Sequence, residues 1–214
     1  MVAMIGYCAA DPNYFELYFD LWASQMNRFY PDMHKIIAVY NPTPDIKNKC
    51  QKYGVELREA ILTENPSRPH FYLLRWLNLP YDTDELILET QINCLPVRTQ
   101  MFSKNQNVGQ LRIVRPKRDT TGGVSAAVIK PDAAKHIVGR AKFMLNDPPD
   151  SDHLMNKWQA ENILWEKSIT EQQFKGTDGK IEPWCCWITA GTSQHYAADW
   201  KLEILKHYVN IKLD

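Results

Sequence analysis

The chain has 214 residues, of which 44% are hydrophobic and 11% aromatic, so it can bury a sizeable core and is not a disordered chain. Its formal net charge of +0 argues against a general nucleic-acid or membrane-surface binder. The 5 cysteines include no Cys-x-x-Cys pair, which excludes a disulfide framework and favours a reducing, cytoplasmic setting. The apolar run at the start is too short for a signal peptide or a membrane span, so we expect a soluble protein.

The first half of the chain alternates between predicted strands and helices. Residues 2–8 are an apolar run typical of a buried strand, and Asp11 with Pro12 then begins a helix that ends before Pro31. The elements that follow are a strand at 34–40, a short helix at 47–53, a strand within 55–66, a helix within 67–80 and a strand across 84–98. This alternation predicts right-handed crossovers and a mostly parallel sheet covered by helices on both faces.

The second half of the chain is less regular. We predict strands at 110–116 and 122–138 with the basic loop 115–123 between them, and then an amphipathic helix at 150–169. A further strand within 174–196 and a closing helix at 199–208 complete the order of elements. The sequence contains no internal repeat and no low-complexity linker, which favours one domain.

Polar residues interrupt the apolar strand expected across 84–98, where Glu89, Thr90 and Gln91 stand together. Residues 89 and 91 of a strand point to the same side, because side chains alternate. Ligands bind beyond the carboxyl ends of parallel strands, so these two oxygen ligands predict a Mg²⁺ or Mn²⁺ ion bound with a diphosphate. A strand that ends in a polar turn is the alternative. The Asp-x-Asp sequence at 82–84 precedes the strand, so we expect it in a turn at the opposite edge.

The ends of the first two strands are expected to hold a nucleotide. Small residues at the end of the first strand would let a base or a ribose approach the backbone, and an aspartate there could accept a ribose hydroxyl besides capping the helix. A tyrosine and an asparagine end the second strand and could flank the base. These residues are Cys8, Ala9, Ala10, Asp11, Tyr40 and Asn41.

Two arginines on the helix within 67–80 are candidates for binding the diphosphate. Arg68 and Arg75 stand at positions i and i+7, which lie on the same face of a helix. A guanidinium group matches the fork geometry of phosphate oxygens, so we expect one of the two to reach the ligand. A salt bridge at the surface is the alternative.

The order of these segments resembles the GT-A glycosyltransferases, which use nucleotide-sugar donors. "ELILETQINCLPVR" resembles the strand that ends in their Asp-x-Asp motif, with Glu89, Thr90 and Gln91 in its place. "GGVSAAVIKP" resembles a segment that lines the donor-sugar site, which implies a contact from Ser125. "AGTSQHY" falls where many members carry a metal-binding histidine, which implies that His195 joins Glu89 and Gln91 as a metal ligand.

The resemblance also implies a general base for an inverting transfer, which would take a proton from the acceptor hydroxyl. "DSDHLMNKWQAEN" falls where the family carries an acidic helix beside the acceptor. We therefore consider Asp152 first and Glu161 second. Capping of the helix within 150–169 is the alternative role of Asp152.

The implied fold is α/β of the Rossmann-like GT-A type, with a central, mixed but mostly parallel sheet flanked by helices. Residues 1–100 would form the nucleotide-binding half of a single domain, and residues 101–214 the half that holds the donor sugar and the acceptor. The implied reaction is metal-dependent transfer of a glucosyl or rhamnosyl group from a UDP-sugar to a glycan or glycoprotein acceptor. The chain is also similar to small glycosyltransferase domains that chlorella viruses encode for capsid glycans, which implies a monomer in the host cytoplasm.

Gln91 departs from the family pattern, because it replaces a charged ligand by a neutral one. We therefore expect Mn²⁺ or Mg²⁺ to bind mainly together with the UDP diphosphate, which supplies anionic oxygens. A non-catalytic nucleotide-binding or carbohydrate-binding module is the alternative function. A sugar nucleotidyltransferase is disfavoured, because no glycine-rich loop with a following lysine comes after the first strand. Whether residues 1–214 are a whole protein or one domain of a longer chain stays open.

Overall fold

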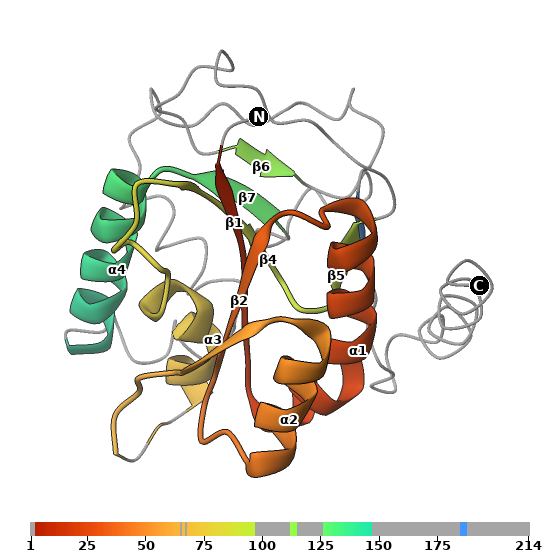
Figure 1. Cartoon of the computed structure of the whole chain (residues 1–214). Coiled ribbons are helices and arrows are strands. Elements are labelled where there is room, and N and C mark those ends of the chain that lie inside the picture. The colour runs from red at the N-terminus through yellow and green to blue at the C-terminus, as the bar shows by residue number, and fades with distance from the viewer. Residues whose placement is uncertain are drawn as a thin grey trace.

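The computed structural model describes residues 3–64, 66, 68–96, 112–114, 126–146 and 185–187. These residues form a six-stranded sheet with the strand order β3-β2-β1-β4-β7-β6 (Figure 1). Strands β1 to β4 are parallel to one another, whereas β7 is antiparallel to both β4 and β6. The bounds are Met4–Ala10 for β1, His34–Val39 for β2, Glu56–Glu59 for β3, Leu86–Thr90 for β4, Arg112–Val114 for β6 and Ala126–Ile129 for β7.

Helices cover both faces of this sheet (Figure 1). Helices α1 and α2 lie on one face, and α3 and α4 lie on the other. A separate buried cluster of apolar side chains fills the space on each face. The helix bounds are Pro12–Phe29 for α1, Pro44–Tyr53 for α2, Arg68–Leu77 for α3 and Pro131–Asn146 for α4. The prediction of a mixed, mostly parallel sheet flanked by helices is therefore confirmed.

Helix α1 begins where the sequence predicts and is tied to the middle of the sheet. The Asp11 side chain accepts a hydrogen bond from the Tyr14 amide at 3.0 Å and so caps the helix. Further along, the indole Nε1 of Trp22 donates to Thr90 Oγ1 of β4 at 2.8 Å, and both side chains are fully buried. This bond satisfies two polar groups that would otherwise be costly in the interior.

Helix α3 ends without a glycine, and side chains satisfy its last carbonyl groups. Asn78 Nδ2 donates to the Leu74 carbonyl at 2.8 Å. The Tyr7 hydroxyl donates to the Arg75 carbonyl at 3.0 Å. Carbonyls in the last turn of a helix have no partner within the helix, so these two bonds replace the usual cap. The bond from Tyr7 also links α3 directly to β1.

The strand predicted across 84–98 is wrong in its extent, because the chain turns in its middle. Strand β4 ends at Thr90, and the Cys94 amide then donates to the Gln91 carbonyl at 2.8 Å, which closes a tight turn. Strand β5, Cys94–Pro96, belongs to a second sheet in which it pairs antiparallel with β8, Cys185–Trp187. Strands β4 and β5 are both mostly buried, so hydropathy alone does not reveal the turn between them.

The long strand predicted at 122–138 is also wrong, because only Ala126–Ile129 is a strand and helix α4 follows directly. Pro131 cannot continue a sheet ladder, but it suits the first turn of a helix, where Asp132 adds an acidic group. The buried residues recur at helical spacing, which the sequence analysis overlooked. They are Ala134, Ile137, Val138, Ala141 and Met144.

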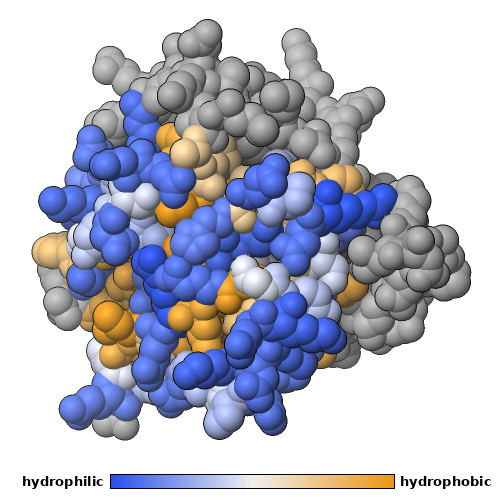
Figure 2. Space-filling model, viewed as in Figure 1, coloured by the Kyte–Doolittle hydropathy of each residue, from blue (hydrophilic) through white to orange (hydrophobic). Residues whose placement is uncertain are grey.

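The strand predicted within 174–196 is confirmed as β8, Cys185–Trp187. The helices predicted at 150–169 and 199–208 lie outside the described residues. No helix in the described part of the chain is long and apolar enough to cross a membrane. Figure 2 shows hydrophilic side chains over much of the described surface in this view, with smaller apolar areas between them.

Candidate nucleotide-binding site

A cavity of about 140 Å³ lies at the carboxyl ends of β1 and β4. Side chains from three places meet there: the β1–α1 junction, helix α3, and the turn between β4 and β5. This is the edge at which open α/β sheets bind their ligands. The residues that line the cavity are Ala9, Ala10, Asp11, Tyr14, Phe71, Leu74, Arg75, Gln91, Ile92 and Asn93.

The β1–α1 junction gives the cavity a wall with little side-chain bulk. Ala9 and Ala10 carry only methyl groups, so a ligand can approach the backbone there. Asp11 is half-buried and lines the cavity while it caps α1. Tyr14, in the first turn of α1, also lines the cavity, and its relative exposure is 45%. An exposed aromatic ring beside a capped helix start is suited to stacking on a flat ligand.

Helix α3 and strand β4 place a buried ion pair at this edge of the sheet. Arg75 Nη1 lies 2.8 Å from Glu89 Oε1, with side-chain exposures of 6% and 0%. A buried carboxylate without a cation would be very costly or would take up a proton, and Arg75 is the cation that balances Glu89 here. Arg75 also lines the cavity, so the same residue borders the cavity and pairs with the buried Glu89.

Tyr7 lies behind this pair in the sheet. Tyr7 and Glu89 are directly paired in the register of β1 and β4, and the Tyr7 hydroxyl donates to the Arg75 carbonyl. Burial is the largest cause that raises the pKa of Tyr7 well above its ordinary value, and electrostatic interactions with Cys8 and Glu89 add to the rise. Tyr7 therefore stays a neutral hydrogen-bond donor throughout the physiological range of pH.

The three residues of the Glu-Thr-Gln motif have three different environments. Glu89 pairs with Arg75 on the α3 face, and Thr90 accepts from Trp22 on the α1 face. Gln91 lies beyond the end of β4 and lines the cavity. Residues 89 and 91 therefore do not form two neighbouring positions on one side of a strand, as the sequence predicted, because the strand ends at Thr90.

This arrangement fits a divalent metal only in part. Gln91 offers a neutral amide oxygen at the cavity, whereas the charge of Glu89 is already balanced by Arg75. Within the described ranges, no group of three or more His, Cys, Asp or Glu side chains could hold a metal ion. Hard divalent cations prefer several oxygen ligands, so the described residues would need oxygens from a bound diphosphate.

The structure brings together five of the residues that the sequence singled out: Ala9, Ala10, Asp11, Arg75 and Gln91. Glu89 reaches this group through its bond to Arg75. Cys8 does not line the cavity. Its side chain is fully buried in the cluster on the α1 face, and burial raises the pKa of this thiol well above its ordinary value.

Two predicted residues follow the end of β2 and are not part of the described lining of the cavity. The Tyr40 ring packs edge-on against Phe71, with 5.5 Å between the ring centroids, and so supports the wall from behind. Asn41 is exposed and has a left-handed backbone with φ of 46°, which turns the chain sharply before Pro42. Arg68 is the first residue of α3, and its contact with a phosphate stays a prediction. Ser125, Asp152, Glu161 and His195 lie outside the described residues.

The sequence analysis missed five residues that line the cavity: Tyr14, Phe71, Leu74, Ile92 and Asn93. A signal was present for Tyr14, because it falls in the first turn of a helix that starts at the ligand edge of the sheet. Ile92 and Asn93 could be found only by recognising the turn after β4. Phe71 and Leu74 are apolar residues of an amphipathic helix, and their spacing does not separate a pocket from a core.

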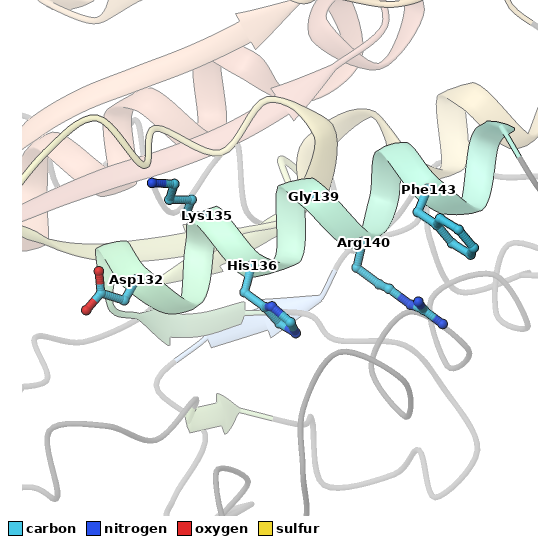
Figure 3. Close-up of a pocket in the computed structure, with 6 residues that line it drawn as sticks. All are labelled: Asp132, Lys135, His136, Gly139, Arg140 and Phe143. Atoms are coloured by element: carbon cyan, nitrogen blue, oxygen red, sulfur yellow. The ribbon is translucent and has the colours of Figure 1, made fainter.

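A larger cavity of about 470 Å³ lies against helix α4. Figure 3 shows that His136, Arg140 and Phe143 project to the same side of this helix. The guanidinium of Arg140 lies 4.9 Å from the centroid of the Phe143 ring, and Asp132, Lys135 and Gly139 complete the described lining. All six residues come from one helix and none from a strand end, so the smaller cavity is the better candidate site.

The Asp82 to Asp84 segment is a turn before β4, as predicted from the sequence. The Glu85 amide donates to Thr83 Oγ1 at 3.1 Å, and Asp82 Oδ1 lies 3.4 Å from Arg58 Nη1. This turn lies at the amino end of β4, at the opposite edge of the sheet from the cavity.

No protein-family model matches the sequence, and no curated protein is a significant match to it. Solved structures with a similar fold are glycosyltransferases and nucleotidyltransferases. An active-site mutant of LgtC, called a galactosyltransferase in a related structure, has a TM-score of 0.64 at 11% identity, over 97% of this chain and 95% of that chain. GlyE from Streptococcus pneumoniae TIGR4, a glycosyltransferase, has a TM-score of 0.63 at 10% identity, over 96% of this chain and 60% of that chain.

A third similar structure is a synthase. The 4-diphosphocytidyl-2C-methyl-D-erythritol synthase of Anaerococcus prevotii DSM 20548 has a TM-score of 0.56 at 13% identity, over 97% of this chain and 98% of that chain. None of these similarities supports a viral origin. Structural similarity at sequence identities this low shows a shared fold and not a shared activity. The chain therefore has the GT-A fold of the nucleotide-sugar transferases, as its sequence predicted.

Proposed function

We propose that this chain is a glycosyltransferase that takes its sugar from a nucleotide-sugar donor. The observation that carries this proposal is the cavity at the carboxyl ends of β1 and β4, where Asp11, Tyr14, Arg75 and Gln91 converge. An aromatic ring, a carboxylate and a guanidinium group are the chemical complements of a base, a ribose and a diphosphate. The similar fold of LgtC, which was solved with donor and acceptor sugar analogues, supports the same conclusion.

In this proposal each wall of the cavity has its own role. The exposed Tyr14 ring stacks on the base, while Ala9 and Ala10 leave room for the nucleoside to approach the backbone. Asp11 accepts a hydrogen bond from a ribose hydroxyl in addition to its cap. The guanidinium of Arg75 faces the diphosphate, and its bond to Glu89 fixes its direction.

The proposed donor is a UDP-sugar, with glucosyl or rhamnosyl transfer to a glycan or glycoprotein. Mn²⁺ or Mg²⁺ would neutralise the charge that develops on the leaving diphosphate. Gln91, Glu89 and His195 are the proposed protein ligands, and the diphosphate would supply the remaining oxygens. Asp152, or else Glu161, would accept the proton of the acceptor hydroxyl.

A nucleotidyltransferase is the second candidate, because a cytidylyl-type synthase shares the fold over nearly the whole chain. Such an enzyme joins a nucleotide to a sugar phosphate and releases pyrophosphate. The described β1–α1 junction argues against it, since Ala9, Ala10, Asp11 and Pro12 contain neither glycine nor lysine to cradle a triphosphate. A non-catalytic binding module remains the third candidate.

The test is thermal unfolding with UDP, GDP and CMP, each with and without Mn²⁺. Saturating nucleotide should raise the Tm by about 5 to 10 °C if it occupies the cavity at a hundred times its Kd. We expect UDP with Mn²⁺ to give the largest shift and Gln91→Ala to reduce it. Gln51→Ala, an exposed change on α2 far from the cavity, is the matched control and should leave the shift unchanged.

Three results would count against the proposal. The absence of a shift with any of the three nucleotides would contradict nucleotide binding. Binding without release of UDP from UDP-glucose or UDP-rhamnose, in the presence of glycan acceptors, would favour the binding module. Release of pyrophosphate from CTP or UTP with a sugar phosphate would favour the nucleotidyltransferase.

A further inference from the structure

We propose that Tyr7 is a positioning residue for the nucleotide site, because it holds the part of α3 that presents Arg75 to the cavity. The inference rests on the proposed function, since it concerns the same cavity. Tyr7 does not line the cavity and therefore acts only through Arg75.

Tyr7 is fully buried on the α3 face of β1. Its neighbour across the ladder is Glu89, which is the carboxylate partner of Arg75. Its hydroxyl reaches the Arg75 carbonyl at 3.0 Å, while Arg75 Nη1 reaches Glu89 at 2.8 Å. The backbone of Arg75 is thus bonded to β1, and its side chain is bonded to the adjacent strand β4.

Both bonds are needed to fix the position of the guanidinium group. An arginine side chain has a long, flexible stem, so one bond at its tip leaves the helix end free to shift. The bond from the Tyr7 hydroxyl restrains the other end of the stem, at the backbone. Because Tyr7 and Glu89 are neighbours in one sheet, the two anchoring points cannot move relative to each other without disturbing the ladder.

The adjacent carbonyl of α3 provides a natural control. The Leu74 carbonyl is capped by Asn78, which also accepts from the Ile61 amide at 2.7 Å. Asn78 does not line the cavity, although Leu74 does, and the bonds described for the Asn78 side chain go to Leu74 and Ile61. The cap from Tyr7 links the end of α3 to the sheet beneath the site, whereas the cap from Asn78 links it to Ile61 after β3.

The experiment measures the Kd of a nucleotide by calorimetry in the presence of Mn²⁺. The nucleotide is the one of UDP, GDP and CMP that raises the Tm of the wild-type chain most. We expect Tyr7→Phe to weaken binding by about 3- to 10-fold, the equivalent of one lost hydrogen bond. Asn78→Ala should weaken binding by less than about 1.5-fold, although it removes the adjacent cap and the bonds with Ile61 as well. In an Arg75→Lys background, Tyr7→Phe should cause no further loss, because the two residues act as a unit.

Equal weakening by Tyr7→Phe and Asn78→Ala would overturn the inference, because it would reduce Tyr7 to a general helix cap. Unchanged binding by Tyr7→Phe would overturn it as well, and so would a full additional loss in the Arg75→Lys background. Circular dichroism checks that each variant is folded, and Tyr7→Met, which also lacks the hydroxyl, replaces Tyr7→Phe if that variant unfolds. A wild-type chain that binds no nucleotide would instead contradict the proposed function, and this inference with it.

Discussion

At the scale of single residues, the Arg75–Glu89 pair has the greatest consequences for stability and for the site. Two opposite charges lie in the interior, where removal of one partner leaves the other without compensation. Most ion pairs described in this chain are of another kind. Lys49 and Glu16, for example, are 2.7 Å apart, but their side chains are 33% and 54% exposed. Such pairs contribute little, because water and salt screen them.

We predict that Glu89→Ala lowers the free energy of unfolding by about 3 to 5 kcal/mol, because it leaves the Arg75 guanidinium buried without its carboxylate. Glu16→Ala is the matched control and should change stability by less than about 0.5 kcal/mol. Urea denaturation followed by circular dichroism measures both values. The double variant Arg75→Leu with Glu89→Leu should recover most of the loss. A Glu89→Ala variant as stable as Glu16→Ala would show that the pair does not hold the interior together.

At the scale of elements, two glycines on the described helices have opposite conformational requirements. Gly54 follows α2 in the left-handed conformation with φ of 65°, and its amide donates to the carbonyls of Cys50 and Gln51. Gly139 lies inside α4, where the backbone is helical. Among the described residues, a Cβ added at either position meets no atom of another part of the chain within 4 Å. Differences between the two substitutions therefore come from the backbone and not from crowding.

We predict that Gly54→Ala destabilises the chain by about 1 kcal/mol, because alanine is strained in the left-handed region. Gly139→Ala should instead stabilise it by about 0.5 to 1 kcal/mol, because alanine loses less entropy than glycine in a helix. The measurement is the urea midpoint of each variant relative to the wild-type chain, and each serves as the control for the other. A shift in the same direction for both would mean that contacts of the side chains outweigh the backbone effect.

At the scale of the whole molecule, the sheet gathers residues from distant parts of the chain at one edge. Parallel strands β1 and β4 are neighbours in the sheet, so Asp11 and Gln91 both line the cavity although they are far apart in the sequence. At the described edge Arg75 balances Glu89 and Gln91 is neutral, so Asp11, which also caps helix α1, is the remaining carboxylate in the described lining. We therefore expect a divalent cation to bind there only weakly in the absence of the nucleotide.

We predict that Mn²⁺ does not bind tightly to the nucleotide-free protein, with a Kd no lower than the millimolar range, about 4 kcal/mol of binding free energy. Its affinity should rise at least tenfold when UDP is present, because the diphosphate supplies anionic oxygens. Calorimetric titration with MnCl₂, with and without UDP, measures this change, and EDTA should leave the Tm of the nucleotide-free chain unaltered. Micromolar binding of Mn²⁺ without nucleotide would refute the prediction.

The sequence by itself determined the features that depend on local patterns. Asp11 and Pro12 marked the start of α1, and the alternation of apolar runs with amphipathic segments indicated a mostly parallel sheet. From that topology the edge of the sheet that carries Ala9, Ala10 and Gln91 could be inferred. Helix α4 was also encoded locally, in the Pro131–Asp132 start and the helical spacing that follows it, although it was read as a strand.

Only the tertiary structure decided which partners these residues have. The Glu89 carboxylate has Arg75 as its partner, 14 residues away, and the Tyr7 hydroxyl bonds a carbonyl 68 residues along the chain. The turn after Thr90 also depends on a distant strand, since β5 pairs with β8. Hydropathy and spacing record whether a position is buried, but a buried polar group is stabilised by its particular partner. That partner is fixed by the packing of α3 on the sheet, which no local pattern in the sequence specifies.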